Sequence, residues 1–171
     1  MQIINKTSQA WGLDAMVAFI IFIASIIFFF FYIINFNDDA GNNIDSLQEE
    51  GNSILRILLT EGYPYNWDVQ NVISPGVISE ERVNSTKVYY LYQISLINYT
   101  RLKTLLNTRK DFYIYFDFPL NASGNLIGGF GKTGINETNI FQNENPDNLV
   151  KVERATIYEN KPGKFNLYVW D

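Results

Sequence analysis

The feature that most constrains this chain of 171 residues is a long apolar run close to its N-terminus. Residues 15–34 carry no charged side chain, and Ser25 and Tyr32 are the only polar residues among these twenty. A helix of this length covers roughly 30 Å at about 1.5 Å per residue, which matches the hydrocarbon core of a bilayer. Ile and Phe surround the whole helix, so it lacks the polar face of a core helix in a soluble protein. We therefore predict a membrane-inserted helix.

A secretory signal peptide is the main alternative for this run. Its apolar core usually has about 7 to 15 residues and ends at a small-residue cleavage site. Here the run is longer and is followed by Asn-Phe-Asn-Asp-Asp at residues 35–39, which does not resemble such a site. Lys6 is the only basic side chain before the run, and Asp38 and Asp39 follow it. This flank favours an N-terminus in the cytoplasm, with the rest of the chain outside as one domain.

Composition excludes several classes of function. The chain has no Cys and no His, which removes disulfides, Cys-His and Ser-His-Asp catalysis, and zinc sites built on these residues. The net charge of −5 leaves no basic stripe for a phosphate backbone, so we expect no nucleic-acid partner. Residues 128–134 end like a phosphate-binding loop, but the leading Gly would stand at Leu126, and we predict a flexible hairpin or connecting loop instead. We expect a protein that is not an enzyme, without a cofactor or metal.

Helical periodicity resumes after the apolar run. Residues 37–43 are rich in Asn, Asp and Gly, which favours a soft joint that interrupts the helix. An amphipathic helix at 44–60 then has its apolar face at Ile44, Leu47, Gly51, Ile54, Leu55, Leu58 and Leu59. Two shorter helices are predicted at 86–97 and 99–107, and Asn98 is a plausible N-cap for the second.

The period changes to two after residue 111. Phe112, Ile114, Phe116 and Phe118 alternate with more polar residues, which predicts a strand followed by a turn at 121–125. Further strands are predicted at 150–157 and 165–170, joined through a hairpin connection at 159–163. The predicted fold class is α+β, with an amphipathic helix packed on an antiparallel sheet.

This architecture resembles the archaeal type IV pilin-like proteins that carry a class III signal peptide. Residues 6–14, Lys-Thr-Ser-Gln-Ala-Trp-Gly-Leu-Asp, form a short polar leader with a basic residue and a Gln, followed by an acid where the apolar run begins. The Gly-Tyr-Pro-Tyr-Asn-Trp loop at 62–67, the strand at 109–116 and the hairpin at 153–170 also resemble stretches of these proteins.

The resemblance implies a leader peptide at 1–10, a transmembrane or filament-core helix at 11–36, and an extracellular pilin-like head domain at 37–171. In this family a membrane peptidase cuts before the apolar segment, which here places the cleavage region at Ser8, Gln9 and Ala10. The mature helices pack into a filament core, where an acid near the new N-terminus meets a neighbour's amine. Asp14 would take that role in assembly.

The implied function is that of a structural subunit, a major or minor pilin or pseudopilin, of an archaeal type IV pilus-like surface filament. Its partners would be copies of itself or other pilins, the prepilin peptidase, the pilus assembly machinery and membrane lipid. The chain would stay in the cell membrane before assembly and then enter an extracellular filament, with an outer domain suited to adhesion.

Two alternatives stay open at this point. Asp14 replaces the family's usual Glu, and it could instead be a helix-start residue at the wet interface, favoured by the helix dipole. The cleavage region also lacks the family's usual basic-Gly or basic-Ala pair. The second function class is an uncleaved, single-pass, membrane-anchored envelope protein whose outer domain binds a ligand or partner.

Asn-x-Ser/Thr sequons are frequent in the chain. Four lie in the predicted outer domain, at Asn84, Asn98, Asn121 and Asn136, and a fifth at Asn5 lies on the cytoplasmic side. The four outer sites are candidates for N-glycosylation, and accidental sequons in an Asn-rich chain are the alternative.

Overall fold

The structure is a computed structural model that describes residues 6–122 and 124–171, without the side chains of residues 6–11, 35–42 and Phe118. The chain divides into two compact units, Met1–Asn42 and Asn43–Asp171. Helix α1 (Lys6–Leu58) contributes to both of them. The predicted break at 37–43 is wrong, because α1 is helical through these residues. The stretch contains no Pro, and a propensity cost of about 0.7 to 1 kcal/mol for each Asn, Asp or Gly does not by itself end a helix.

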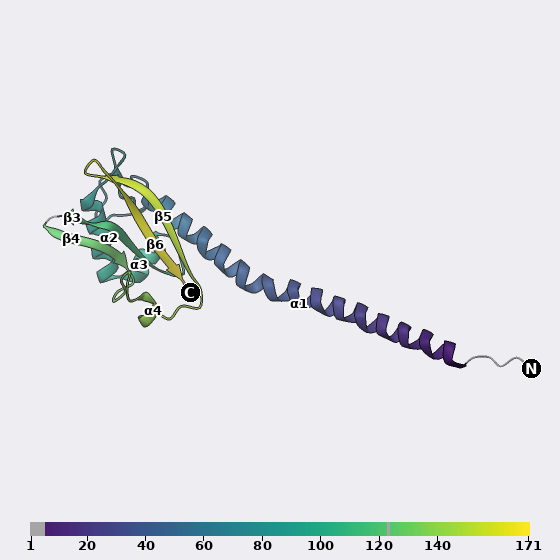
Figure 1. The fold of residues 1–171 in the computed structure, drawn as a ribbon. Coiled ribbons are helices and arrows are strands. Elements are labelled where there is room, and N and C mark those ends of the chain that lie inside the picture. Colours follow the sequence, from purple (N-terminus) through teal and green to yellow (C-terminus); the bar gives the residue numbers. More distant parts are fainter. Residues whose placement is uncertain (1–5, 123) are drawn as a thin grey trace, which may run out of the picture. The chain divides into compact units, whose positions relative to one another are not determined.

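The second unit contains an antiparallel sheet and several short helices after α1 (Figure 1). Its elements are β1 (Ile78–Ser79), β2 (Arg82–Val83), α2 (Ser85–Ile97), α3 (Tyr99–Leu105), β3 (Asp111–Ala122), β4 (Asn125–Gly131), α4 (Ile140–Asn143), β5 (Leu149–Tyr158) and β6 (Lys161–Trp170).

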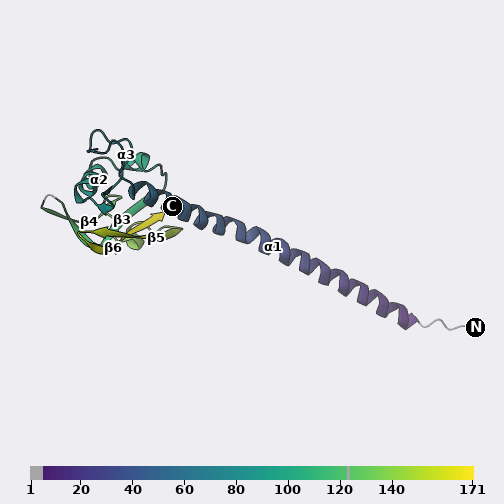
Figure 2. The same ribbon diagram turned by 90° about the horizontal axis from the view of Figure 1, so that it is seen from above.

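The main sheet has four strands in the order β4-β3-β6-β5, and every neighbouring pair is antiparallel. In the centre of the sheet, Ile114 of β3 stands opposite Phe130 of β4 on one side and Leu167 of β6 on the other. Within this unit, α2, α3 and the last turns of α1 lie on one face of the sheet (Figure 2). The chain therefore has the predicted α+β fold, with an N-terminal apolar helix, an amphipathic helical segment and an antiparallel sheet.

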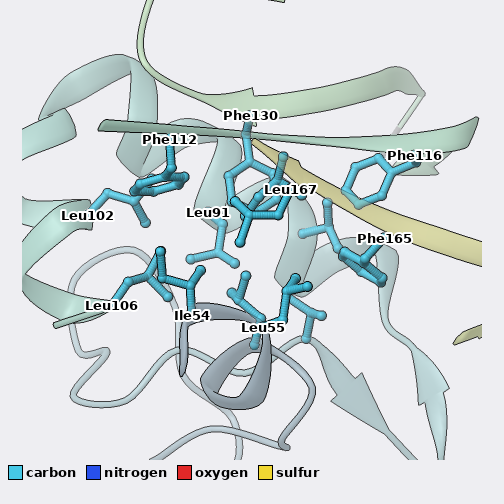
Figure 3. Packing of buried hydrophobic residues seen from close by; sticks show 14 of the residues in the cluster. Ile54, Leu55, Leu91, Leu102, Leu106, Phe112, Phe116, Phe130, Phe165 and Leu167 are labelled. Carbon is cyan, nitrogen blue, oxygen red and sulfur yellow. The ribbon is translucent and has the colours of Figure 1, made fainter. Parts of the chain in front are cut away.

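The hydrophobic core lies between that face of the sheet and the helices. Leu47, Ile54, Leu55 and Leu58 are fully buried, and their spacing places them on one side of α1. Figure 3 shows Ile54 and Leu55 directed toward Leu91 of α2 and toward the side chains of the sheet. The sheet contributes residues from alternate positions, as the period of two predicted: Phe112, Ile114, Phe116, Phe165, Leu167 and Val169.

Gly51 lets α1 approach the sheet closely. A Cβ at this position would lie 2.8 Å from Cγ2 of Val152 and 3.3 Å from Cγ2 of Val169. Gly in a helix interior costs roughly 0.5 to 1 kcal/mol relative to Ala. At position 51 the helix loses this stability, and the absence of a Cβ allows close packing against the sheet. Its predicted place on the apolar face is confirmed, whereas Ile44, predicted on the same face, is 46% exposed.

The Gly-rich residues 128–134 were predicted to be a flexible hairpin or a connecting loop. Residues 125–131 are strand β4, which forms a hairpin with β3, so residues 128–131 belong to a hairpin and not to a connecting loop. At Gly129 a Cβ would lie 2.3 Å from the carbonyl oxygen of Ile114, so the close approach of β4 to β3 requires glycine there. A strand with two buried apolar side chains, Ile127 and Phe130, gives little alternation to detect.

The predicted helices and hairpins are largely confirmed. The predicted helices at 86–97 and 99–107 correspond to α2 and α3, and the Asn98 side chain accepts a hydrogen bond from the Arg101 N–H, as expected of an N-cap. The connection between β5 and β6 is shorter than predicted. It consists of Glu159 and Asn160, both with positive φ, and β6 begins directly afterwards.

Candidate functional site

The first candidate site is the apolar segment of α1. Gly12–Ile34 has a mean hydropathy of 3.0, and none of it is buried within the structure. Among the described residues it is the one helical segment long and apolar enough to cross a membrane. Large apolar side chains are exposed on every side of the helix, from Phe28 at 76% to Ile26 and Ile33 at 38%. Burial of so much apolar surface requires lipid or other protein chains.

The Ser25 hydroxyl inside this segment is satisfied within the helix. Ser25 Oγ donates a hydrogen bond to the carbonyl oxygen of Ile21 at 2.8 Å. A hydroxyl bonded in this way can enter an apolar medium without leaving an unpaired donor. Phe29 and Phe30 meet edge to face, with their ring centroids 6.1 Å apart.

Asp14 lies near the start of the apolar segment and is exposed. In the described part of the chain its carboxylate has neither an ion pair nor a hydrogen bond. Ser8, Gln9 and Ala10, the predicted cleavage region, lie in the first turns of α1, and their side chains are outside the described residues. Asn5 is also outside the described residues.

The four outer sequons differ in how their side chains are held. Asn98 and Asn121 are exposed, whereas Asn84 and Asn136 are half-buried. Asn84 caps α2 by accepting from the Thr86 and Lys87 N–H groups, and its Nδ2 donates to Ser79 Oγ at 3.3 Å. Asn136 accepts from backbone N–H groups of the loop that follows it.

These differences rank the candidate glycosylation sites. We predict that at least one outer sequon carries a glycan, that Asn98 and Asn121 are modified in preference to Asn84, and that Asn5 is bare. The reason is access, because the amide nitrogen of Asn84 is already bonded to Ser79. Glycopeptide mass spectrometry of native protein measures the occupancy, and Asn98→Gln is the matched control for assignment. Four bare outer sites, or a modified Asn5, would contradict the prediction.

A cluster of charged residues joins the start of β3 to the segment that carries α4, and sequence analysis did not identify it. Asp111 accepts from Lys103 Nζ at 2.9 Å and from Lys132 Nζ at 2.8 Å. Lys132 also pairs with Glu144, whose carboxylate accepts from Trp170 Nε1 at 3.4 Å. Burial alone would raise the pKa of Asp111, but the two lysine hydrogen bonds outweigh burial and lower it. The carboxylates of Asp111 and Glu144 are both paired with lysine, so the cluster holds the segment that carries α4 against the sheet.

Lys87, a buried lysine outside this cluster, was also not identified from the sequence. It is 5% exposed, and its Nζ donates to the carbonyl oxygens of Glu61 and Ile78 at 2.7 and 3.2 Å. Burial lowers the pKa of its ammonium group, and the neighbouring Glu61 opposes that effect. The acceptors lie 26 and 9 residues away in sequence, so no local pattern signals the contact. Within the described ranges, no group of three or more His, Cys, Asp or Glu side chains is placed to hold a metal ion.

Comparison with known proteins does not assign the chain to a family. Neither the scan against family models nor the searches of curated proteins and of solved structures found a match to the chain.

Proposed function

We propose that this chain is a structural subunit of an archaeal type IV pilus-like surface filament, assembled through its N-terminal helix. The observation that carries the proposal is α1 itself, whose first part is apolar on every side while its last turns form part of the core of a sheet domain. Such a helix joins an insoluble assembly segment to a folded outer domain in one continuous element.

The energetics of the apolar segment support this role. Fifteen of the residues in Gly12–Ile34 are Ile, Leu, Val or Phe. At about 0.3 to 0.6 kcal/mol each, these residues favour the interior of a membrane by roughly 4 to 9 kcal/mol. A filament core made of the same helices from neighbouring subunits replaces lipid by equally apolar protein, so transfer from the membrane into the filament keeps the segment out of water.

Asp14 supplies the specific element of this proposal. It lies within a segment that is otherwise apolar and has no partner among the described residues. A carboxylate that enters an apolar core requires an opposite charge, and the α-amine of a processed neighbouring subunit is one. The pairing would fix the axial register between subunits.

The proposed topology places the N-terminus in the cytoplasm and the second unit outside the cell. Lys6 is the basic residue that keeps the N-terminal flank in the cytoplasm. The four outer sequons then lie outside the cell membrane, where glycans are added. The proposed partners are other pilins, the prepilin peptidase, the assembly machinery and membrane lipid. An exposed sheet domain repeated along a filament also suits adhesion.

An uncleaved, single-pass envelope protein with a ligand-binding outer domain is the second candidate. The same apolar segment would serve as a permanent anchor, and the outer domain would act alone. The two functions differ at the leader, because only the filament subunit must lose it.

We predict a cut between Thr7 and Trp11 in protein recovered from the cell surface. The basic, small polar and apolar residues stand in the order of a prepilin leader, although the usual basic-Gly or basic-Ala pair is absent. Intact-mass analysis of a sheared surface fraction measures the cut, with the membrane fraction of peptidase-deficient cells as the control. Surface protein that keeps residues 1–9 would favour the uncleaved envelope protein.

A further inference from the structure

A groove of about 540 Å³ lies between the loop that follows α1 and the first turns of α2. Its lining combines aromatic rings with short polar side chains. The aromatic residues of the lining include Tyr65, Trp67 and Tyr90, and the polar residues include Asn66, Glu80 and Thr86.

The floor of the groove is held rigidly. Trp67 is 1% exposed, and its Nε1 donates to the carbonyl oxygen of Gly76 at 3.0 Å. Its ring meets that of Tyr90 edge to face, with the centroids 5.8 Å apart. The buried Lys87 ties the groove to the residues after α1 through its bonds to the carbonyls of Glu61 and Ile78. A groove built on such contacts is largely formed before any ligand arrives, which lowers the entropic cost of binding.

Tyr65 provides an aromatic surface at the edge of this groove. Lys87 Nζ lies 4.9 Å from the centroid of its ring, so a cation–π contact orients the side chain. More than half of the side chain nevertheless remains exposed, at 56%. An oriented, exposed ring that belongs to no core is available to a ligand.

Unused polar groups surround this ring. The side chains of Asn66, Glu80 and Thr86 are exposed, and across residues 6–122 and 124–171 none of them makes a hydrogen bond. Together they offer an amide, a carboxylate and a hydroxyl as donors and acceptors. Glu80 is positioned by the tight turn between β1 and β2, where it has a φ of 51°.

We propose that this groove binds a neutral saccharide. The apolar C–H face of a pyranose ring packs on an exposed aromatic ring, while its hydroxyls require the amide, carboxylate and hydroxyl partners that the groove presents. This proposal does not depend on filament assembly, since the groove lies within the second unit alone.

Other ligand classes fit this lining less well. Among the described residues of the lining, Lys87 is the only cation. Its ammonium is committed to two carbonyls and an aromatic ring, and the Glu80 carboxylate repels anions. An apolar ligand would remove the Glu80 carboxylate from water without compensation. A saccharide satisfies both the ring and the polar groups.

The test uses the full chain reconstituted in phosphatidylcholine nanodiscs, because maltoside detergents carry sugar head groups. Saturation-transfer NMR with lactose, cellobiose, maltose and N,N′-diacetylchitobiose is expected to detect binding of at least one disaccharide. Tyr65→Ala is expected to lower its affinity at least about tenfold, whereas Tyr65→Phe keeps the ring and the binding. Tyr63→Ala is the matched control, since Tyr63 is 65% exposed on the same loop and does not line the groove.

Asn66→Ala combined with Glu80→Gln provides a second test that does not depend on the ring, and it is expected to weaken binding as well. A parallel titration with oligosaccharides released from native protein separates the two sources of sugar. If the groove prefers these oligosaccharides, the ligand is a glycan on a neighbouring copy of the chain. If it prefers the free disaccharides, the ligand is an external saccharide. Three results would overturn the proposal: no saccharide binds, Tyr65→Ala and the double variant bind like the wild type, or inorganic phosphate occupies the groove instead.

Discussion

Replacement of both Ile23 and Ile26 by arginine is expected to remove the chain from the membrane. Both positions lie near the middle of Gly12–Ile34. An arginine at the centre of a spanning helix costs about 2.5 to 3.5 kcal/mol, so the pair costs about 5 to 7 kcal/mol. This cost offsets most of the roughly 4 to 9 kcal/mol by which the apolar residues of the segment favour insertion. Extraction of membranes with alkaline carbonate measures the fraction of the chain that stays inserted.

The matched control for this experiment is the variant with leucine at both positions. Leucine preserves the apolar surface and the helix propensity, so we expect wild-type retention. An arginine variant that resists extraction as well as the leucine variant would show that residues 12–34 do not lie within the bilayer. The sheet domain is expected to be unaffected, because no residue of the apolar segment belongs to its core.

Asp14→Ala is expected to suppress filament assembly while leaving the monomer folded and inserted. Loss of one partner of a buried ion pair leaves the other charge uncompensated and typically costs about 3 to 5 kcal/mol. If Asp14 only starts the helix at the wet interface, the loss is about 0.3 to 1 kcal/mol, and filaments should form. The two roles therefore predict different outcomes. The measurement is a filament count by electron microscopy, normalised to the amount of the chain in the membrane.

Asp14→Glu is the control for the charge, since it keeps the carboxylate and restores the acid that is usual in pilin-like proteins. We expect it to assemble. Normal filament numbers from the Ala variant would contradict the pairing role and leave Asp14 as a helix-start residue.

The parts of the fold that depend on local periodicity could be predicted from the sequence. The alternation from Phe112 to Phe116 predicted β3, and the spacing of Leu47, Ile54 and Leu58 predicted the buried side of α1. Asn98 was recognisable as a cap because its bond to the Arg101 N–H is local. These features share one property: the residues that make them lie within a few positions of each other.

The features that prediction missed depend on contacts between distant parts of the chain. Gly129 belongs to a strand because β3 lies against it, and a Gly-rich stretch gives no periodic signal of that partner. Glu50 accepts hydrogen bonds from Thr108 Oγ1 and the Arg109 N–H, which lie 58 and 59 residues further along the chain. The continuity of α1 through 37–43 was missed for a different reason, because low helix propensity was given more weight than the absence of Pro.

The candidate sites divide in the same way. Asp14 and the sequons could be identified because each depends on residue type and near neighbours. The groove proposed to bind a saccharide could not, because Tyr65, Glu80 and Tyr90 are brought together only by the folded loop between α1 and α2.

Cryo-electron microscopy of filaments sheared from the cell surface tests the proposed function most directly. The proposal predicts a filament whose core consists of residues 11–36 from many copies of this chain, with Asp14 beside a neighbour's N-terminal amine and the sheet domain on the outside. Surface filaments that lack this chain, with the chain itself recovered uncleaved and unassembled from the membrane, would contradict it.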